Sequence, residues 1–324
     1  MRDLRNFRLR EWLQLLPLQH GVKQVRNDVW QRHYCARRPA ALHAFLEQHA
    51  HLKDGSIVLV VAFEQPWMLS WLIRMARRNV RDATVLVFDN SRRAQARAEI
   101  EQVCRETSTP CLALPLNGTL HVNRSHGMAM TWIYRNVVQA LEPRLFAFID
   151  HDLIAVEPLA IADRLGDQVM YGLPNQSPWG WHLWGGYCLF DYHRIAPARL
   201  NFLNDFSRGL DTGGRNWQPL YRWHDPAGMR SAGIEFLDIA DAASGSTVQL
   251  QVVDRSWLHI GGIGYNDNYR LKSELSHRIA QAFDDGATWD EIRASGTFGG
   301  PGSGSGSGQT PARAQAVFDA PKQP

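Results

Sequence analysis

The sequence predicts an α/β protein with a mostly parallel central sheet flanked by helices and preceded by an N-terminal helical extension. Short apolar runs alternate with segments of helical periodicity four times before residue 150. This alternation is typical of a parallel sheet built from right-handed crossovers. The last of these runs, 146–149, is apolar throughout, and a continuous apolar run indicates a strand buried on both faces.

Local signals place the expected elements along the chain. Pro66 suits the first turn of a helix, where its missing N–H is not needed. Asp89-Asn90-Ser91, which ends a predicted strand, supplies an N-cap for the following helix, and Ser125 can cap another. The expected strands up to this point are 57–63, 84–88, 111–116 and 146–149. After residue 152 the periodicity weakens, and we expect helices at 157–165, 268–284 and 288–294 and strands at 169–173, 187–190, 248–253 and 256–260.

Residues 1–55 form the predicted helical extension in front of the main domain, 56–298. Within 1–20, four arginines accompany Leu9, Trp12, Leu13 and Leu16 at helical spacing, and a second helix is expected at 27–50. The basic amphipathic helix has two interpretations. It can pack on the domain as an accessory helix, or it can dock on an anionic membrane surface.

Composition excludes several classes of protein. The formal net charge of the 324 residues is only +3, so we expect no nucleic-acid partner. The four cysteines are scattered without a CxxC pair, which argues against a zinc site and for reduced thiols. No apolar run is long enough for a membrane span, and the N-terminus lacks a secretory apolar segment, so we expect a cytoplasmic protein.

The C-terminal end has the composition of an artificial addition. Residues 299–308 consist largely of alternating Gly and Ser, like a designed flexible linker. We interpret 309–324 as a grafted peptide, tethered so that its effective concentration is high. The alternative is a natural low-complexity tail.

Two aspartates follow the predicted strand 146–149. Asp150 and Asp152 flank His151, at the carboxyl end of a strand, where open α/β sheets bind ligands. Their carboxylates can bind one hard divalent cation; alternatively they form an acidic turn. Neither GxGxxG nor GxxxxGK[ST] occurs, so the phosphates of a nucleotide would need another partner, and a metal ion held by the aspartates would serve.

Residues 175–187 are rich in Trp, Gly and Pro. This composition favours a loop that closes over a ligand, with a plain structural loop as the alternative. Trp184, Gly185 and Gly186 lie at its end.

In this order of features the sequence resembles the GT-A glycosyltransferases, particularly those similar to family 2. The similarity lies in Val-Phe-Asp89-Asn-Ser, in the DxD motif Phe-Ile-Asp150-His-Asp152, in Leu183-Trp-Gly-Gly-Tyr-Cys-Leu-Phe and in the late His259. It covers roughly residues 56–265. The Gln-x-x-Arg-Trp motif of processive synthases is absent.

The resemblance implies a GT-A fold and a role for each matching residue. Asp89 would recognise the base or ribose, with Ala62 and Glu64 beside it, and Asp150 would contact ribose or metal. Asp152 and His259 would bind Mn²⁺ or Mg²⁺; an imidazole fits Mn²⁺ slightly better. His259 has a competing interpretation as a hydrogen-bonded core histidine. Trp184, Gly185 and Gly186, on the strand that resembles the acceptor-side strand, are assigned to the donor site.

Sugar transfer with inversion requires a base that takes the proton of the acceptor hydroxyl. Asp211, ahead of Thr-Gly-Gly, is the candidate, although it could instead be a helix N-cap. Asp225 and Glu235 are weaker candidates. Inverting and retaining chemistry both remain open.

The resemblance therefore implies a hexosyltransferase that uses a nucleotide-sugar, with a UDP-sugar expected. The grafted peptide suggests a peptide or protein acceptor; Thr310 is the only hydroxyl side chain in 309–324, and Arg313 is an N-linked alternative. Two other functions are transfer to a lipid-linked or envelope glycan and non-catalytic binding of a peptide or glycan.

Overall fold

The structure is a computed structural model that describes residues 2–196, 198–241, 246–261, 269–295 and 297–298. The predicted linker 299–308 and peptide 309–324 lie outside the described residues. All four cysteines are free. Within the described residues, no helix is both long and apolar enough to cross a membrane.

The centre of the molecule is a six-stranded sheet with the order β3-β2-β1-β4-β7-β6. The first four strands in this order run parallel to one another, and β6 and β7 add an antiparallel pair at one side. The strands are β1 (Ser56–Ala62), β2 (Thr84–Asp89), β3 (Cys111–Ala113), β4 (Leu145–Asp150), β6 (Met170–Ser177) and β7 (Gly180–Asp191). Flanked by helices, this mostly parallel sheet confirms the predicted fold class.

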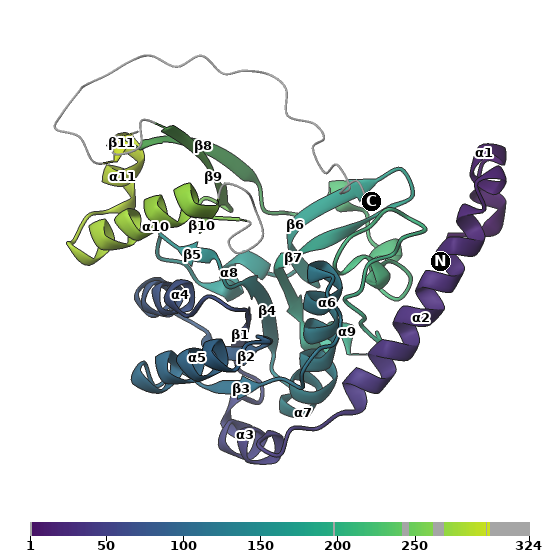
Figure 1. Cartoon of the computed structure of the whole chain (residues 1–324), viewed down its shortest axis with the longest axis horizontal. Helices are drawn as coiled ribbons and strands as arrows, with labels where there is room; N and C mark the ends of the chain where they lie inside the picture. Colours follow the sequence, from purple (N-terminus) through teal and green to yellow (C-terminus); the bar gives the residue numbers. More distant parts are fainter. Residues whose placement is uncertain (1, 197, 242–245, 262–268, 296, 299–324) are drawn as a thin grey trace.

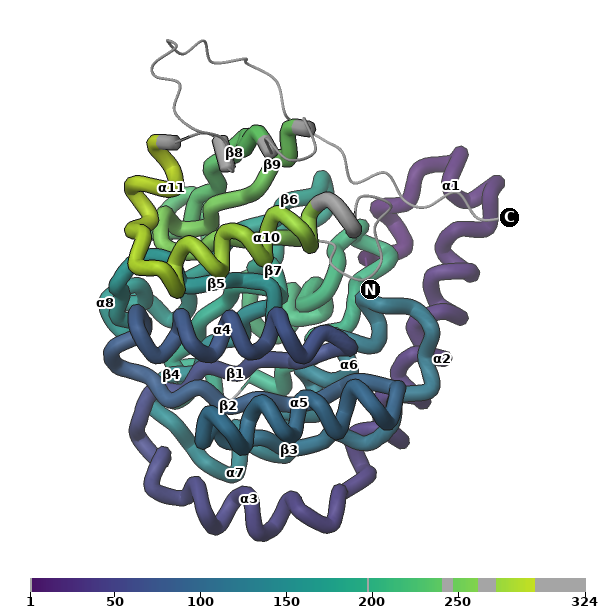
Figure 2. The backbone as a smooth tube through the Cα atoms, turned by 60° about the vertical axis from the view of Figure 1, so that its left-hand side comes forward, coloured from purple at the N-terminus to yellow at the C-terminus, as the bar shows by residue number. Residues whose placement is uncertain are grey.

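Helices cover both faces of this sheet (Figures 1 and 2). α4 (Pro66–Asn79) and α5 (Ala94–Glu106) lie on one face, and α6 (Val122–Ile133) lies on the other; α6 continues through a π-helical turn at Tyr134–Val138 into α7 (Gln139–Leu141). Side chains of β1 alternate between the two cores: Val58 and Val60 face α4, whereas Leu59 faces α6. β1 is thus buried on both faces, as its apolar run predicts.

A second sheet has the order β11-β8-β9-β10-β5 and lies beside α4, which contacts β5, and α10, which contacts β11 (Figure 1). Its strands are β5 (Leu153–Ala155), β8 (Ile234–Asp241), β9 (Ser246–Val253), β10 (Trp257–His259) and β11 (Thr297–Phe298). The nearby helices are α8 (Ile161–Leu165), α10 (Tyr269–Asp284) and α11 (Trp289–Ser295). Because β4 ends at Asp150 and β5 begins at Leu153, the chain passes from one sheet to the other at the two aspartates.

The remaining elements are short, apart from one long N-terminal helix. That helix is α2 (Leu16–Ala36), preceded by α1 (Leu9–Leu13) and followed by α3 (Leu42–Gln48) and later by α9 (Tyr192–Ile195). The 3-10 helices are Leu4–Asn6, Ala50–Leu52, Gly214–Trp217, Tyr221–Trp223 and Pro226–Gly228.

Several local predictions are wrong. The expected helix 27–50 is two helices, α2 and α3, with Pro39 between them, because proline disfavours the helical conformation of the residue before it. The helix expected to start at Ser125 starts at Val122, capped by His121. The expected ligand-covering loop 175–187 is mostly the β6–β7 hairpin, whose register runs from Ser177 opposite Gly180. The Trp and Gly residues of this segment hide the usual pattern of a strand, because each strand is stabilised by pairing with its neighbour in the same segment.

Candidate active site

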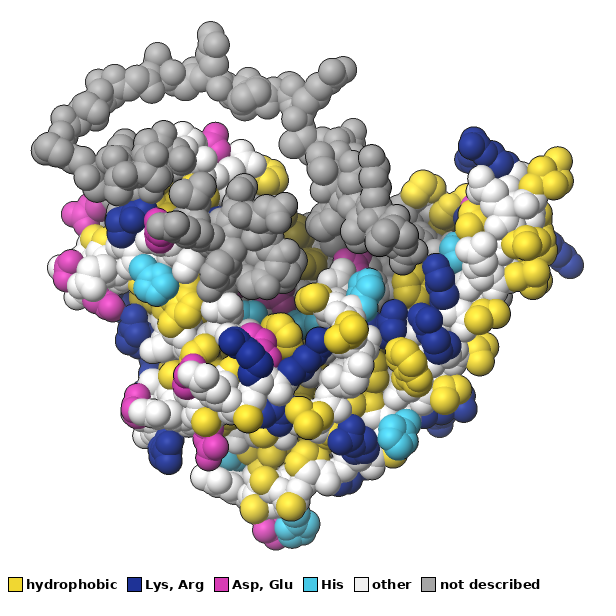
Figure 3. Space-filling model, viewed as in Figure 1, with side chains coloured by type: hydrophobic (Ala, Val, Ile, Leu, Met, Phe, Trp, Pro, Cys, Tyr) yellow, Lys and Arg dark blue, Asp and Glu magenta, His cyan; other side chains and the backbone are white. Residues whose placement is uncertain are grey.

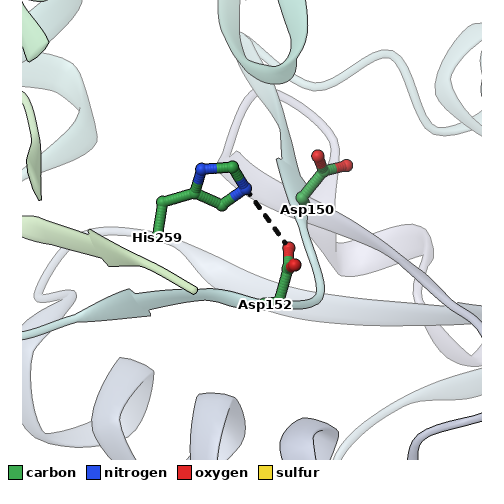
Figure 4. Close-up of side chains that lie close together, drawn as sticks. All are labelled: Asp150, Asp152 and His259. Atoms are coloured by element: carbon green, nitrogen blue, oxygen red, sulfur yellow. Dashed lines mark ion pairs between the residues drawn. The ribbon is translucent and has the colours of Figure 1, made fainter. Parts of the chain in front are cut away.

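Three side chains converge at the carboxyl end of β4. Asp150, Asp152 and His259 each offer one ligand atom, and these atoms all lie within 4.8 Å of one another. His259 Nε2 is 3.7 Å from Asp152 Oδ1. In Figure 4 the imidazole at the end of β10 points toward Asp152, with Asp150 beside it. The structure therefore brings together the DxD pair and the late histidine, which are separated by about a hundred residues of sequence.

Strand pairing between the sheets positions this cluster. β5 follows Asp152 directly and pairs antiparallel with β10, so that Leu153 lies opposite His259. The backbone N–H of Ile260 also donates to the carbonyl oxygen of Asp152 at 3.1 Å. The register of a short strand pair thus sets the distance between the histidine and the second aspartate.

The His259 ring has a fixed orientation. Its Nδ1 forms a hydrogen bond of 2.8 Å with Gln251 Oε1 on β9, and the edge of Trp184 lies against it, with ring centroids 4.8 Å apart. A hydrogen bond from Nδ1 leaves Nε2 as the ligand atom, the arrangement typical of metal-binding histidines. The hydrogen bond of Nδ1 with Gln251 is compatible with both interpretations of His259. A hydrogen-bonded histidine uses Nδ1, and a metal ligand uses Nε2.

The electrostatics of the cluster favour a bound cation. Burial and, after it, the neighbouring Asp152 carboxylate raise the pKa of Asp150 to about 6, although His259 and His151 oppose the shift. His126 on α6 lies 3.4 Å from Asp150, between Nε2 and Oδ1, yet burial lowers the pKa of His126 to about 4, so it is neutral at pH 7. Two carboxylates and one imidazole are a ligand set that suits a divalent ion such as Mn²⁺ or Mg²⁺.

Gly186 leaves room for the first aspartate. A Cβ at this position would lie 2.4 Å from Asp150 Oδ2 and 2.3 Å from the Trp184 ring, closer than real contacts allow. At Gly185 the neighbour would instead be the methyl group of Thr212, at 3.0 Å. From β7, the strand paired with β4, Gly186 therefore borders Asp150 and Trp184 borders His259, whereas Gly185 borders Thr212.

The predicted nucleotide-recognition residues lie at the same sheet edge. Ala62 pairs with Asp89, and Val61 pairs with Asp150. Asp89 is only 2% exposed and accepts a hydrogen bond from the backbone of Ser91. Burial raises the pKa of Asp89.

Glu64 is also engaged by its own chain. Its carboxylate accepts hydrogen bonds from the backbone N–H groups of Arg92 and Arg93 and forms an ion pair with the Arg93 side chain. The carboxylates of Asp89 and Glu64 therefore shape the loop beside the site as well as bordering it.

Asp211 is held near the cluster but caps no helix. The 3-10 helix that follows is capped by Gly213, so the capping alternative is wrong. The Asp211 carboxylate accepts hydrogen bonds from the amides of Asn123, at 2.9 and 3.0 Å, and Asn204. Its charge helps to raise the pKa of Asp150, which indicates proximity.

The two weaker base candidates are engaged in other interactions. Asp225 accepts a hydrogen bond from Ala227 at the start of a 3-10 helix. Glu235 forms an exposed ion pair with Arg293 on α11.

Sequence reasoning missed several residues that support the site. Gln251 orients His259, His126 contacts Asp150, and Lys272 Nζ donates to the carbonyl oxygens of Ile260 and Gly261. Beside His259 lies a cavity of about 210 Å³ that is lined by Gln251, Ile260, Gly261, Lys272, Phe236 and Gln249. None has a distinctive sequence signal, because each reaches the site from an element that only tertiary packing brings near.

No family model matches the chain, and no curated protein matches it. Among solved structures, the chain is similar to the bifunctional glycosyltransferase WbbM, with 11% identity over 44% of this chain and 33% of that chain and a TM-score of 0.31. It is also similar to glucosyl-3-phosphoglycerate synthase from Mycobacterium tuberculosis, solved with Mn²⁺ and UDP-glucose, with 16% identity over 42% of this chain and 48% of that chain and a TM-score of 0.28.

A mannosyltransferase from Pyrobaculum calidifontis, solved with GDP-mannose and Mn²⁺, is 8% identical over 55% of this chain and 56% of that chain, with a TM-score of 0.34. The chain thus spans less than two thirds of the length of each of these three proteins. At these TM-scores the likenesses assign no function, and an assignment has to come from the geometry of Asp150, Asp152 and His259.

Proposed function

We propose that the chain is a metal-dependent glycosyltransferase that moves a hexose from a nucleotide-sugar, preferably a UDP-sugar, to an acceptor hydroxyl. The observation that supports this is the convergence of Asp150, Asp152 and His259 within 4.8 Å at the carboxyl edge of a mostly parallel sheet. Ligands of open α/β sheets bind at this edge. The absence of a glycine-rich phosphate loop makes a cation the natural partner of a diphosphate.

In this proposal Asp152 and His259 are the main ligands of Mn²⁺ or Mg²⁺, and Asp150 contacts the ion or the ribose. When bound, the ion offsets the negative charge that develops on the departing diphosphate. Gln251 holds the ligating nitrogen of His259 toward the site, and Gly186 keeps the Asp150 carboxylate accessible. Asp89, with Ala62 and Glu64, borders the base and ribose, while Trp184 and Gly185 border the sugar.

Asp211 is the proposed general base. A base must present a carboxylate oxygen to the acceptor hydroxyl and hold that orientation. The amides of Asn123 and Asn204 donate to Asp211, so they fix its position. Asp211 would then accept the hydroxyl proton as the oxygen attacks the anomeric carbon.

The proposed acceptor is a peptide or protein in the cytoplasm. Support comes from 309–324, which follow the artificial-looking Gly/Ser segment 299–308 and include one hydroxyl side chain, Thr310. Intact-mass spectrometry after incubation with Mn²⁺ and a donor panel should show one added hexose, which Thr310→Val removes. Modification that persists in Thr310→Val but not in Arg313→Lys would move the acceptor to Arg313. If the chain stays unmodified, the proposal of a tethered acceptor is refuted, but the proposal for the donor site is not.

Thermal unfolding with UDP or GDP, with and without Mn²⁺, tests the donor site. Nucleotide and Mn²⁺ together should stabilise the protein by about 2.7 kcal/mol at a hundred times the dissociation constant, and a chelator should remove the effect. Asp152→Asn and His259→Ala should abolish it.

The exposed Asp238 and His43 provide the matched controls Asp238→Asn and His43→Ala, which should keep the full shift. Stabilisation that needs no metal, or that survives in Asp152→Asn, would contradict the proposal. Peptide or glycan binding with no dependence on metal or nucleotide would favour a non-catalytic binding module instead.

A further inference from the structure

Along the middle of helix α2, polar side chains face the protein and apolar side chains face solvent, whereas Tyr34 and Cys35 near its C-terminal end are buried in the core. Asn27 and Gln31 on the inner side are each only 2% exposed. Gln31 donates hydrogen bonds to Thr131 and Asn201 and accepts one from the Asn201 amide. A helix that covers a core normally shows the reverse distribution.

The solvent side of α2 carries an apolar stripe. The exposed fractions are 56% for Leu15, 61% for Leu18, 70% for Val22, 64% for Val25 and 57% for Val29. Their alternating spacing of three and four residues puts them on one face of the helix. Leu9 and Leu13 of α1, each 77% exposed, extend the apolar surface beyond the start of α2.

Positive charge accompanies the stripe. Residues 2–38 contain nine Lys and Arg but three Asp and Glu, so this segment carries a net charge of +6 while the whole chain carries +3. Figure 3 shows Lys and Arg side chains interspersed with hydrophobic ones along the edge formed by α1 and α2. Lys23, Arg26 and Arg32 are exposed on α2 itself.

The segment is anchored to the main domain at both ends of the stripe. The Arg2 guanidinium lies 4.2 Å from the Trp179 ring centroid and 3.7 Å from that of Phe7, and its backbone N–H donates to Ser207. On α2, Asp28 forms an ion pair with Arg215. The apolar, basic surface is therefore held in place on a fixed scaffold.

We propose that the stripe formed by Leu15, Leu18, Val22, Val25 and Val29 docks on an anionic lipid surface. Apolar side chains beside Lys and Arg are what an interfacial helix uses, since the former enter the acyl boundary and the latter contact anionic headgroups. A second copy of the chain fits less well. The seam spans only about two heptads, shorter than a stable coiled coil requires, and two segments of charge +6 repel each other.

Vesicle co-sedimentation of the full chain tests the proposal. The protein should bind vesicles of phosphatidylcholine with about 30 mol% phosphatidylglycerol, bind weakly to phosphatidylcholine alone, and dissociate as salt increases. The combined variant Leu18→Gln, Val22→Gln and Val25→Gln keeps the charge and should bind at least about tenfold more weakly. Lys23→Gln, Arg26→Gln and Arg32→Gln together should weaken binding about a hundredfold.

A matched control removes the same charge elsewhere: Arg78, Arg81 and Arg105 are exposed on or beside α4 and α5, and their replacement by Gln should cost much less affinity. Circular dichroism should show the same melting temperature for all variants, because every substituted side chain is exposed. Vesicle binding that is absent, or unchanged in the Leu18, Val22 and Val25 variant, would overturn the proposal. So would a dimer in light scattering that this variant abolishes, because the stripe would then belong to a second copy.

Discussion

At Gly186 the site depends on the absence of a side chain. We predict that Gly186→Ala weakens the joint stabilisation by nucleotide and Mn²⁺ by at least about tenfold in affinity, because its Cβ would displace the Asp150 carboxylate and the Trp184 ring. Titration followed by thermal shift measures this. Gly228→Ala is the control, since a Cβ there meets nothing within 4 Å. Equal affinities in the two variants would show that Asp150 tolerates displacement.

His182 makes stability depend on pH. The side chain is 3% exposed, neither ring nitrogen has a hydrogen-bond partner among the described residues, and burial lowers the pKa of His182 to about 4 even though Asp211 opposes the shift. Because the unfolded chain binds the proton more tightly, stability is complete above about pH 6.5 and is lost as the pH falls toward 4.

Urea unfolding at a series of pH values should therefore give a shallower slope for His182→Leu. The difference should reach about 1.4 kcal/mol per pH unit between pH 4 and 6.5. Parallel curves for the two proteins would mean that His182 becomes protonated without unfolding.

Among the elements, the β9–β10 turn joins the two sheets and so carries His259 to its place. Asp254 in this turn is 8% exposed and accepts hydrogen bonds from the hydroxyl groups of Tyr171 and Tyr187 on the six-stranded sheet, at 2.7 and 2.8 Å. We predict that Asp254→Ala lowers the free energy of unfolding by about 3 kcal/mol, because both hydroxyl groups stay buried without an acceptor.

Chemical denaturation measures this effect, and Asp238→Ala is its control. Asp238 also accepts a side-chain hydrogen bond, from Gln249, but lies exposed on β8, so its loss should cost less than about 0.5 kcal/mol. If Asp254→Ala and Asp238→Ala were equally stable, the hydrogen bonds of Asp254 in the β9–β10 turn would not be what joins the two sheets.

At the scale of the whole molecule, the middle of α2 is attached to the main domain by polar contacts, and Tyr34 and Cys35 near its end enter the hydrophobic core. We predict that Gln31→Ala, which removes the bonds to Thr131 and Asn201, lowers stability by about 2 kcal/mol and speeds hydrogen exchange throughout 16–36. Gln19→Ala on the exposed side of the same helix should change neither. Exchange in 16–36 that is unchanged in Gln31→Ala would place the attachment elsewhere, for instance at Arg215 and Asp28.

Local patterns determined much of this molecule. The apolar runs that become β1, β2 and β4 are buried on both faces, and a run of that kind has few other stable environments than a covered parallel sheet. The position of Asp150 and Asp152 at the carboxyl edge follows from the same pattern, because carboxylates end a buried strand. The sequence also predicted the basic and apolar character of the N-terminal segment.

Tertiary structure decided what depends on pairing between distant segments. His259 joins the aspartates only because β10 pairs with β5 in one register, and strand partners far apart in the chain leave no local periodicity. The β6–β7 hairpin could not be predicted for a related reason. Its Trp and Gly residues adopt the strand conformation because the two strands pair with each other. The outward direction of the apolar side of α2 depends on Asn27 and Gln31 finding buried partners in the main domain, since periodicity defines the two faces of a helix but not which of them meets the protein.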